Sequence, residues 1–174
     1  GLPLLLVLGT LGFWLRESGV DLKTIGFMSW VGLCWGMKWL WAPLVDRLRL
    51  PYLTRTLGRR RAWLVLTQVC LMLSIGALAF TNPSCELALT GFLAAVTAFL
   101  GATQDIAIDA YRIENGSEEQ QAAFAAAYQT GYRIAMIWAG AGTLAIAGTF
   151  DNRVGGGWCI AYLTMSASML VGLV

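Results

Sequence analysis

The sequence predicts an all-α fold, a polytopic bundle of membrane-spanning helices. Three observations lead to this prediction: 57% of the 174 residues are hydrophobic, 13% are charged, and the mean hydropathy is +0.65. A hydrocarbon core about 30 Å thick is crossed by about 20 apolar residues in a helix, and several separated apolar runs have about this length. The net charge of +2 is too small to indicate a nucleic-acid partner. The expected environment of the chain is therefore a lipid bilayer.

Six apolar runs are expected to form the helices, four as full spans and the outer two as partial ones. The expected spans are residues 1–15, 24–41, 62–80, 87–110, 122–150 and 158–174. The first run lacks a helix start and the last stops without a polar cap, so the first and last helices are expected to be truncated and the chain to be a fragment. The short polar connections are typical of hairpin loops, which predicts a single transmembrane domain over 1–174.

The orientation follows from the basic residues of the connections. The loop over 42–61 carries Arg47, Arg49, Arg55, Arg59, Arg60 and Arg61. Because Lys and Arg accumulate in cytoplasmic loops, this loop is expected to be cytoplasmic. Alternation of the spans then puts Arg112 on the same side, which leaves Arg16, Lys23 and Arg153 outside.

The composition also limits the chemistry. The chain has no histidine, and its four cysteines lack the Cys-x-x-Cys spacing, so neither a metal site nor a disulfide framework is indicated. No cofactor is expected. An enzyme is the least supported class, since a nucleophile elbow, a metal cluster and a phosphate-binding loop are all missing from the sequence. Any proton coupling would use carboxylates, helped by lysine or tyrosine.

The most informative stretch ends the apolar run that begins at Leu87. It contains no charge until Asp105, after which Asp109 and Arg112 follow at spacings of four and three. These spacings place all three side chains on one face of a helix. A charge inside the bilayer costs roughly 2.5–3.5 kcal/mol on insertion scales. The three side chains are therefore expected to face protein or a water-filled cavity.

Two further charges lie in other spans. Lys38 is about two turns from Pro43, so it could share the depth of Asp105, whereas Arg133 is expected to lie roughly 10 Å deeper. Direct pairing of Asp105 with Arg133 is therefore not expected, and a bridging water or ligand is easier.

These charges have two interpretations. In the functional one, Lys38 and Arg133 attract an anionic solute and Asp105 or Asp109 titrates. In the structural one, the charges neutralise one another between packed helices, or Lys38 reaches the interface. The functional interpretation is favoured for Asp105 and Arg133, and the structural one for Asp109 and Arg112, which would fix the end of the hairpin or form a cytoplasmic gate.

Three uncharged polar residues are candidates for substrate contact: Gln104, Gln129 and Tyr132. They could hydrogen-bond to a sugar or amide-rich ligand. They could equally bond to neighbouring helices, where such bonds contribute about 0.6 kcal/mol each.

The stretch Ala42-Pro-Leu-Val-Asp-Arg, followed by Leu57-Gly-Arg-Arg-Arg, resembles the loop signature between helices two and three of the major facilitator superfamily. It departs from that pattern at Pro43 and by an insertion over 48–56. The resemblance implies a lock of helix ends whose release lets the two halves of the transporter rock. The residues expected to form the lock or gate are Asp46, Arg47, Gly58, Arg59, Arg60 and Arg112.

Further motifs extend the resemblance. With Gly1-Leu-Pro-Leu, Asp21-Leu-Lys-Thr-Ile-Gly-Phe, Gln104-Asp-Ile-Ala-Ile-Asp-Ala and Gly131-Tyr-Arg, the chain resembles the AmpG family of muropeptide permeases from residue 1 to about 142. The resemblance implies the amino-terminal six-helix half of a facilitator that imports anhydro-muropeptides across the bacterial inner membrane by proton symport. A second six-helix half is then the expected partner. Two alternatives stay open: a related carrier of another solute such as acetyl-CoA, and a non-transporting membrane interaction protein.

Overall fold

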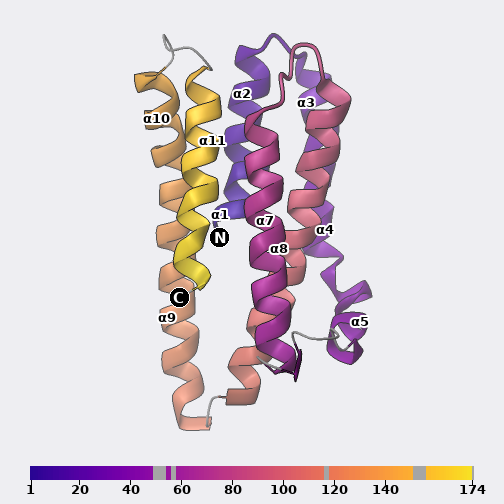
Figure 1. The fold of residues 1–174 in the computed structure, drawn as a ribbon, viewed down its shortest axis with the longest axis vertical. Helices are drawn as coiled ribbons and strands as arrows, with labels where there is room; N and C mark the ends of the chain where they lie inside the picture. Colours follow the sequence, from indigo (N-terminus) through magenta and orange to yellow (C-terminus); the bar gives the residue numbers. More distant parts are fainter. Residues whose placement is uncertain (49–53, 56–57, 116–117, 151–155, 174) are drawn as a thin grey trace.

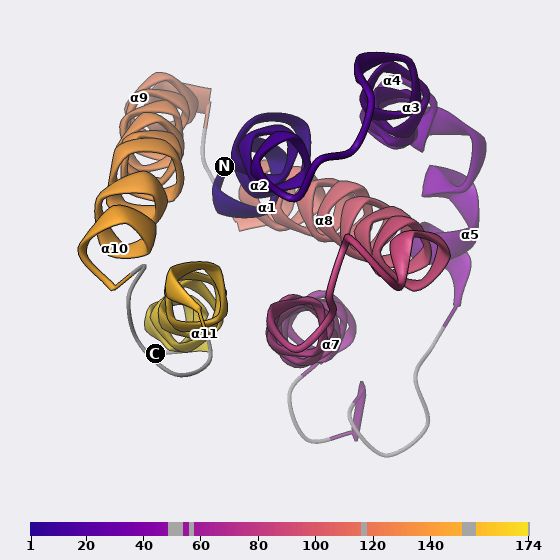
Figure 2. The ribbon, with the colours of Figure 1, turned by 90° about the horizontal axis from the view of Figure 1, so that it is seen from above.

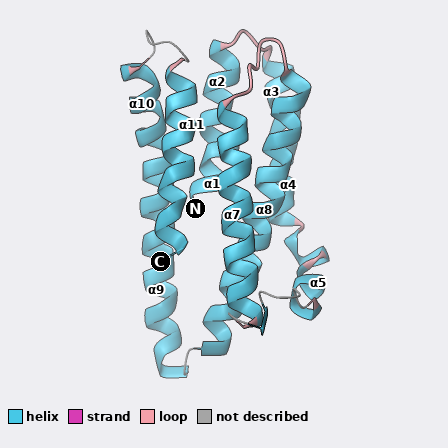
Figure 3. Ribbon diagram, viewed as in Figure 1, coloured by secondary structure: helices cyan, strands magenta, loops and turns pink. Residues whose placement is uncertain are grey.

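The computed structural model describes residues 1–48, 54–55, 58–115, 118–150 and 156–173. Within these residues the regular structure is helical, without a strand (Figure 3). The all-α prediction is confirmed.

Several helical segments follow one another without a gap. The first stretch consists of α1 (Leu2–Leu5), the π-helical η1 (Leu6–Thr10) and α2 (Leu11–Glu17). The second contains α3 (Leu22–Met28), the 3-10 turn η2 (Ser29–Gly32) and α4 (Leu33–Gly36), followed by the 3-10 turn η3 (Lys38–Leu40) and α5 (Ala42–Arg47). Next come α7 (Arg59–Ala79) and α8 (Leu87–Asn115). The last two stretches are α9 (Glu118–Ile137), the π-helical η4 (Trp138–Gly142) and α10 (Thr143–Thr149), and then α11 (Gly157–Ser168) with the 3-10 turn η5 (Met169–Leu173).

Two of the described helices, α7 and the Leu87–Glu114 part of α8, are long and apolar enough to cross a membrane. The run Gly157–Gly172 is apolar but shorter. The division of the chain into six spans therefore stays a prediction.

Some helix boundaries differ from the expected ones. Helix α7 begins at Arg59, directly after Gly58, whose φ of 81° lies in the left-handed region that favours glycine. Helix α8 continues to Asn115 and α9 begins at Glu118, so most of the loop expected over 113–121 is helical. The charged start of α7, the end of α8 and the start of α9 thus extend beyond the apolar runs from which the spans were predicted.

The stretch expected as one helix over 24–41 is instead broken. Helix α4 ends at Gly36, and Met37 has φ −98° and ψ 6°. A 3-10 turn follows, and then α5 starts with Pro43 in its first turn. Proline has no N–H and is accommodated in the first turn of a helix but not in its interior. The helix therefore has to restart just before Pro43, which leaves Lys38 on a short turn between two helices.

The helices lie roughly along one long axis, and the chain turns back on itself at each end (Figure 1). Helix α7 packs against α8 and α11, α11 packs against α10, and α1 contacts both α8 and α9. The end-on view in Figure 2 shows this arrangement, with α3, α4 and α5 beside α8 on one side and α9 and α10 on the other. Helix α8 therefore contacts helices that precede it in the sequence, such as α1 and α7, and also α9, which follows it.

Aromatic side chains connect the first and last helical stretches. The rings of Trp14 and Trp158 stack at 5.9 Å with an interplanar angle of 13°. The indole Nε1 of Trp158 donates to Glu17 Oε2 at 2.6 Å, and the Tyr162 hydroxyl donates to the Leu6 carbonyl at 3.3 Å. These contacts join α2 and η1 to α11; helix α2 and the start of α11 lie at the upper end of the bundle in Figure 1.

We predict that truncating a buried side chain of α7 destabilises the bundle far more than truncating an exposed one. Leu71 is 0% exposed and Leu73 is 68% exposed. Leu71→Ala is expected to lower the free energy of unfolding by about 2–5 kcal/mol because it leaves a cavity, and Leu73→Ala by less than about 0.5 kcal/mol. Thermal unfolding of the purified protein in detergent measures both. Equal losses would contradict the packing of α7.

Candidate functional site

The helix break at Met37 places Lys38 next to α8. The ammonium Nζ of Lys38 lies 3.4 Å from Asp109 Oδ2, and both side chains are 37% exposed. The sequence suggested that Lys38 shares a depth with Asp105, but the ion pair is made one turn further along, with Asp109. The continuous helix assumed for 24–41 explains the difference, because breaking it changes where Lys38 lies along α8.

Asp109 has a second cation on its own helix. Arg112 Nη2 lies 3.8 Å from Asp109 Oδ1, and the guanidinium of Arg112 is stacked 5.5 Å from the ring centroid of Tyr128 on α9. Such a cation–π contact contributes about 0.5–2 kcal/mol, depending on desolvation. Asp109 thus contacts the turn that carries Lys38, and Arg112 contacts α9; their role in fixing the hairpin end or forming a cytoplasmic gate stays a prediction.

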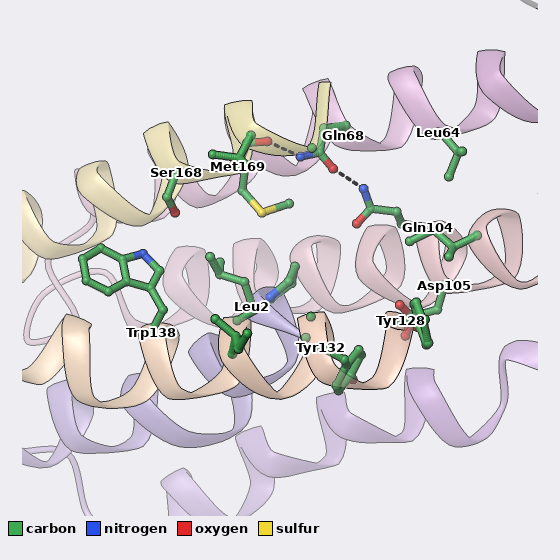
Figure 4. Close-up of a pocket in the computed structure, with 18 of the residues that line it drawn as sticks. Leu2, Leu64, Gln68, Gln104, Asp105, Tyr128, Tyr132, Trp138, Ser168 and Met169 are labelled. Carbon is green, nitrogen blue, oxygen red and sulfur yellow. Dashed lines mark hydrogen bonds between the residues drawn. The ribbon is translucent and has the colours of Figure 1, made fainter. Parts of the chain in front are cut away.

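Asp105 has a different environment. It is partly buried and lines a cleft of about 640 Å³ together with Gln68, Gln104, Tyr128 and Tyr132 (Figure 4). In the part of the chain that the structure describes, no lysine or arginine forms an ion pair with Asp105. It is a carboxylate on an apolar helix, beside hydroxyl and amide groups that can donate hydrogen bonds.

Two glutamines continue the polar side of this cleft. Gln104 Nε2 donates to Gln68 Oε1, and Gln68 Nε2 donates to the backbone carbonyl of Met169 in η5 (Figure 4). Gln68 is buried, with 4% exposure. One polar chain therefore joins α8, α7 and η5, so the helix-joining alternative for Gln104 is realised while its amide still lines the cleft.

The other predicted residues of α9 separate into two groups. Tyr132 lines the cleft, whereas Gln129 and Arg133 are exposed and are not among its lining residues. Among the described residues Arg133 forms no ion pair, and its role in binding an anionic solute stays a prediction. The structure thus does not bring Arg133 to the polar cluster of α8.

Three of the six expected lock residues, Asp46, Arg59 and Arg60, belong to one group of ion pairs between α5, α7 and the end of α8, at the lower end of the bundle in Figure 1. Arg60 Nη1 lies 2.5 Å from Asp46 Oδ1, and Arg60 Nη2 lies 2.6 Å from Glu114 Oε1. Arg59 Nη2 lies 3.6 Å from the same Glu114 oxygen. Arg60 therefore connects α5, α7 and α8, while Arg47 is exposed.

Sequence reasoning missed three residues of this region: Gln68, Tyr128 and Glu114. Gln68 is an uncharged polar residue within an apolar run, the same signal that identified Gln104. Tyr128 lies four residues before Tyr132 and therefore on the same helix face. Glu114 was assigned to a loop, but α8 extends past it, so its carboxylate lies against α7.

Comparison with known proteins identifies the class. A family model described as "Acetyl-coenzyme A transporter 1" matches residues 1–87. The anhydromuropeptide permease of Escherichia coli (strain K12) is 41% identical over 163 residues, which cover 94% of this chain and 32% of the permease. The putative transporter AmpG 4 of Rickettsia felis is 34% identical over 174 residues, which cover 100% of this chain and 41% of that protein.

The matches define the class as a family of transporters. It belongs to the transporter family described by the acetyl-coenzyme A transporter 1 model, and its resemblance to the AmpG permeases is confirmed by the relatives at 41% and 34% identity. It spans about a third of the length of the E. coli permease that it matches.

We predict that Arg60 stabilises the lower end of the bundle more than its neighbour Arg59 does. The Arg60 side chain is 13% exposed and contacts two carboxylates, whereas that of Arg59 is 38% exposed and contacts one at 3.6 Å. Arg60→Ala is expected to lower the free energy of unfolding by about 2 kcal/mol, and Arg59→Ala by less than about 1 kcal/mol. Thermal unfolding in detergent gives the comparison, and a larger loss for Arg59→Ala would contradict the assigned contacts.

Proposed function

We propose that the chain is the amino-terminal, six-helix half of a major facilitator-type transporter that imports anhydro-muropeptides across the bacterial inner membrane by proton symport. The observation that carries this proposal is Asp105. It is an ionisable group on an apolar helix, it lines a cleft, and it has no cation at ion-pair distance among the described residues. Ionisable residues in such positions are typical of proton relays in transporters.

The substrate class is supported by the relatives. The E. coli protein that is 41% identical to the chain is named anhydromuropeptide permease. A muropeptide contains sugar hydroxyls and peptide amides, and the cleft offers groups that can bind both: the carboxamide of Gln104, which Gln68 holds in place, and the phenol groups of Tyr128 and Tyr132. We assign Gln104, Tyr128 and Tyr132 to substrate binding, and Asp105 to proton coupling.

A second half is part of the proposal. The matched relatives are longer than this chain, which covers 32% and 41% of two of them. In transporters of this type the substrate lies near the middle of the membrane, between two repeats. The exposed Gln129 and Arg133 then face either that second half or the substrate between the halves. The loop over 42–61 is assigned to the cytoplasmic side because of its arginines.

A second candidate substrate is acetyl-CoA, favoured by the name of the family model that matches residues 1–87. Its phosphates would need cations on the cleft. Among the described residues no lysine or arginine lines the cleft, so the cleft itself offers no side-chain cation to these phosphates. We therefore place anhydro-muropeptides first.

We predict that the full-length parent takes up labelled anhydro-muropeptide into vesicles when a proton gradient is imposed, and that Asp105→Asn abolishes this uptake. Asparagine keeps the size and hydrogen-bonding capacity of the side chain but cannot bind and release a proton. Uptake is measured with and without the gradient, beside the amount of inserted protein. Labelled acetyl-CoA is assayed in the same vesicles.

Asp21→Asn is the matched control. Asp21 caps α3 by accepting a hydrogen bond from the Thr24 N–H at 3.3 Å, and asparagine is an equally good residue at this position of a helix. It should leave uptake unchanged. No uptake of muropeptide by a well-inserted parent would exclude the assignment, and loss of the Asp105→Asn protein from the membrane would support a purely structural lock.

A further inference from the structure

Two carboxylates on α8 share one lysine. Asp105 and Asp109 are one helical turn apart on the same face of α8, a spacing at which the Cβ atoms are about 5–6 Å apart. Lys38 Nζ contacts Asp109 at 3.4 Å, and the same ammonium also interacts electrostatically with Asp105. One cation thus contacts one carboxylate and interacts electrostatically with a second carboxylate one helical turn away.

We propose that Lys38 exchanges between Asp109 and Asp105, and that Asp109 is a positioning residue which holds Lys38 away from Asp105 while Asp105 carries a proton. This inference rests on the proposed function, in which Asp105 is the proton-coupling group. When Asp105 binds a proton from one side of the membrane it is neutral, and Lys38 pairs with Asp109. When Asp105 releases that proton to the other side, Lys38 pairs with the newly formed carboxylate.

The surroundings of Asp109 allow the lysine to leave. Arg112 lies 3.8 Å from the other carboxylate oxygen of Asp109, so Asp109 keeps a cation after Lys38 has moved. Without Arg112, each departure of Lys38 would leave an uncompensated charge at an apolar helix, which is costly. The second cation makes the two pairings closer in free energy, as an exchange requires.

Lys38 also has the freedom to move. It lies on the short turn η3, between the ends of α4 and α5, and its side chain is 37% exposed. Lysine presents a compact charge on a flexible four-carbon stem, unlike the rigid fork of arginine. Its ammonium can therefore shift by one helical turn without a change in α8.

The other groups that face Asp105 do not replace Lys38. They are the indole of Trp35 on α4, the phenol groups of Tyr128 and Tyr132 on α9, and the α-amino group of Gly1 before α1. The indole is uncharged, and the phenols are neutral near pH 7. In a parent protein in which Gly1 is an internal residue, its nitrogen is an uncharged amide, and Lys38 is then the cation that interacts with Asp105 among the described residues.

The test uses the full-length parent in vesicles and follows exchange of labelled anhydro-muropeptide with equal pH on both sides. On the alkaline side, the pH at which this substrate exchange falls to half its maximum is called the midpoint here. The midpoint reports the proton affinity of Asp105, the proposed coupling site. In Asp109→Asn, Lys38 is free to pair with Asp105 and favours its charged form, so the midpoint should move to lower pH by about one unit or more. In Lys38→Met the ionised form loses its cation, and the midpoint should move to higher pH.

The double variant Asp109→Asn, Lys38→Met distinguishes movement of Lys38 between the two carboxylates from a direct electrostatic effect of Asp109 on Asp105. If Asp109 acts by holding Lys38, the acid shift caused by Asp109→Asn is largely lost when Lys38→Met is already present. An equal acid shift in both backgrounds would overturn the exchange. A smaller extent of substrate exchange in the variants, without any movement of the midpoint, would also overturn the lysine exchange, because it indicates that Lys38 and Asp109 form a purely structural ion pair.

Asp109→Glu keeps the negative charge and should keep the midpoint of the parent, so the proposal stays testable if Asp109→Asn inserts poorly. A shift in Asp109→Glu as large as that in Asp109→Asn would contradict the role of the charge. Absence of any exchange in the parent would reject the proposed substrate. An active parent whose midpoint is insensitive to these substitutions would reject only the lysine exchange.

Discussion

Charges on a membrane helix have to be compensated by protein or exposed to water, and this constraint organises the structure around α8. The helix is apolar from Leu87 onward and carries three carboxylates in its second half, Asp105, Asp109 and Glu114. Each of them points to a different neighbour. Glu114 joins α8 to the start of α7, Asp109 joins it to the turn that carries Lys38, and Asp105 faces the cleft beside α9. The packing of the lower part of the bundle follows from these three requirements.

Compensation of these carboxylates decreases from the end of the helix inward. Glu114 contacts two arginines at 2.6 and 3.6 Å, and Asp109 contacts a lysine and an arginine at 3.4 and 3.8 Å. Asp105 forms no ion pair within the described residues. An ion pair with several hydrogen bonds resists change, while an unpaired carboxylate can be neutralised by a proton. This gradient agrees with an anchoring role for Glu114 and supports the proposal that Asp105 is the group that binds and releases a proton.

The sequence was sufficient for the helical class, the approximate position of α7 and α8, and the grouping of Asp105, Asp109 and Arg112 on one face, because these depend on hydropathy and helical period. It was not sufficient for the partner of Lys38. That partner depends on the break at Met37, which a continuous apolar run does not reveal. Gln68 was missed for a similar reason, since its role depends on contacts with α8 and η5 that lie 36 and 101 residues away.

Proton symport is tested most directly by measuring whether protons enter together with the substrate, and whether this proton movement depends on Asp105. Vesicles containing the full-length parent are given anhydro-muropeptide without an imposed gradient, and the external pH is recorded with a sensitive electrode. If protons enter with the substrate, the medium becomes more alkaline as substrate enters, and the Asp105→Asn protein gives no pH change. Entry of substrate without proton movement, or an undiminished pH change in the Asp105→Asn protein, would contradict proton coupling at Asp105.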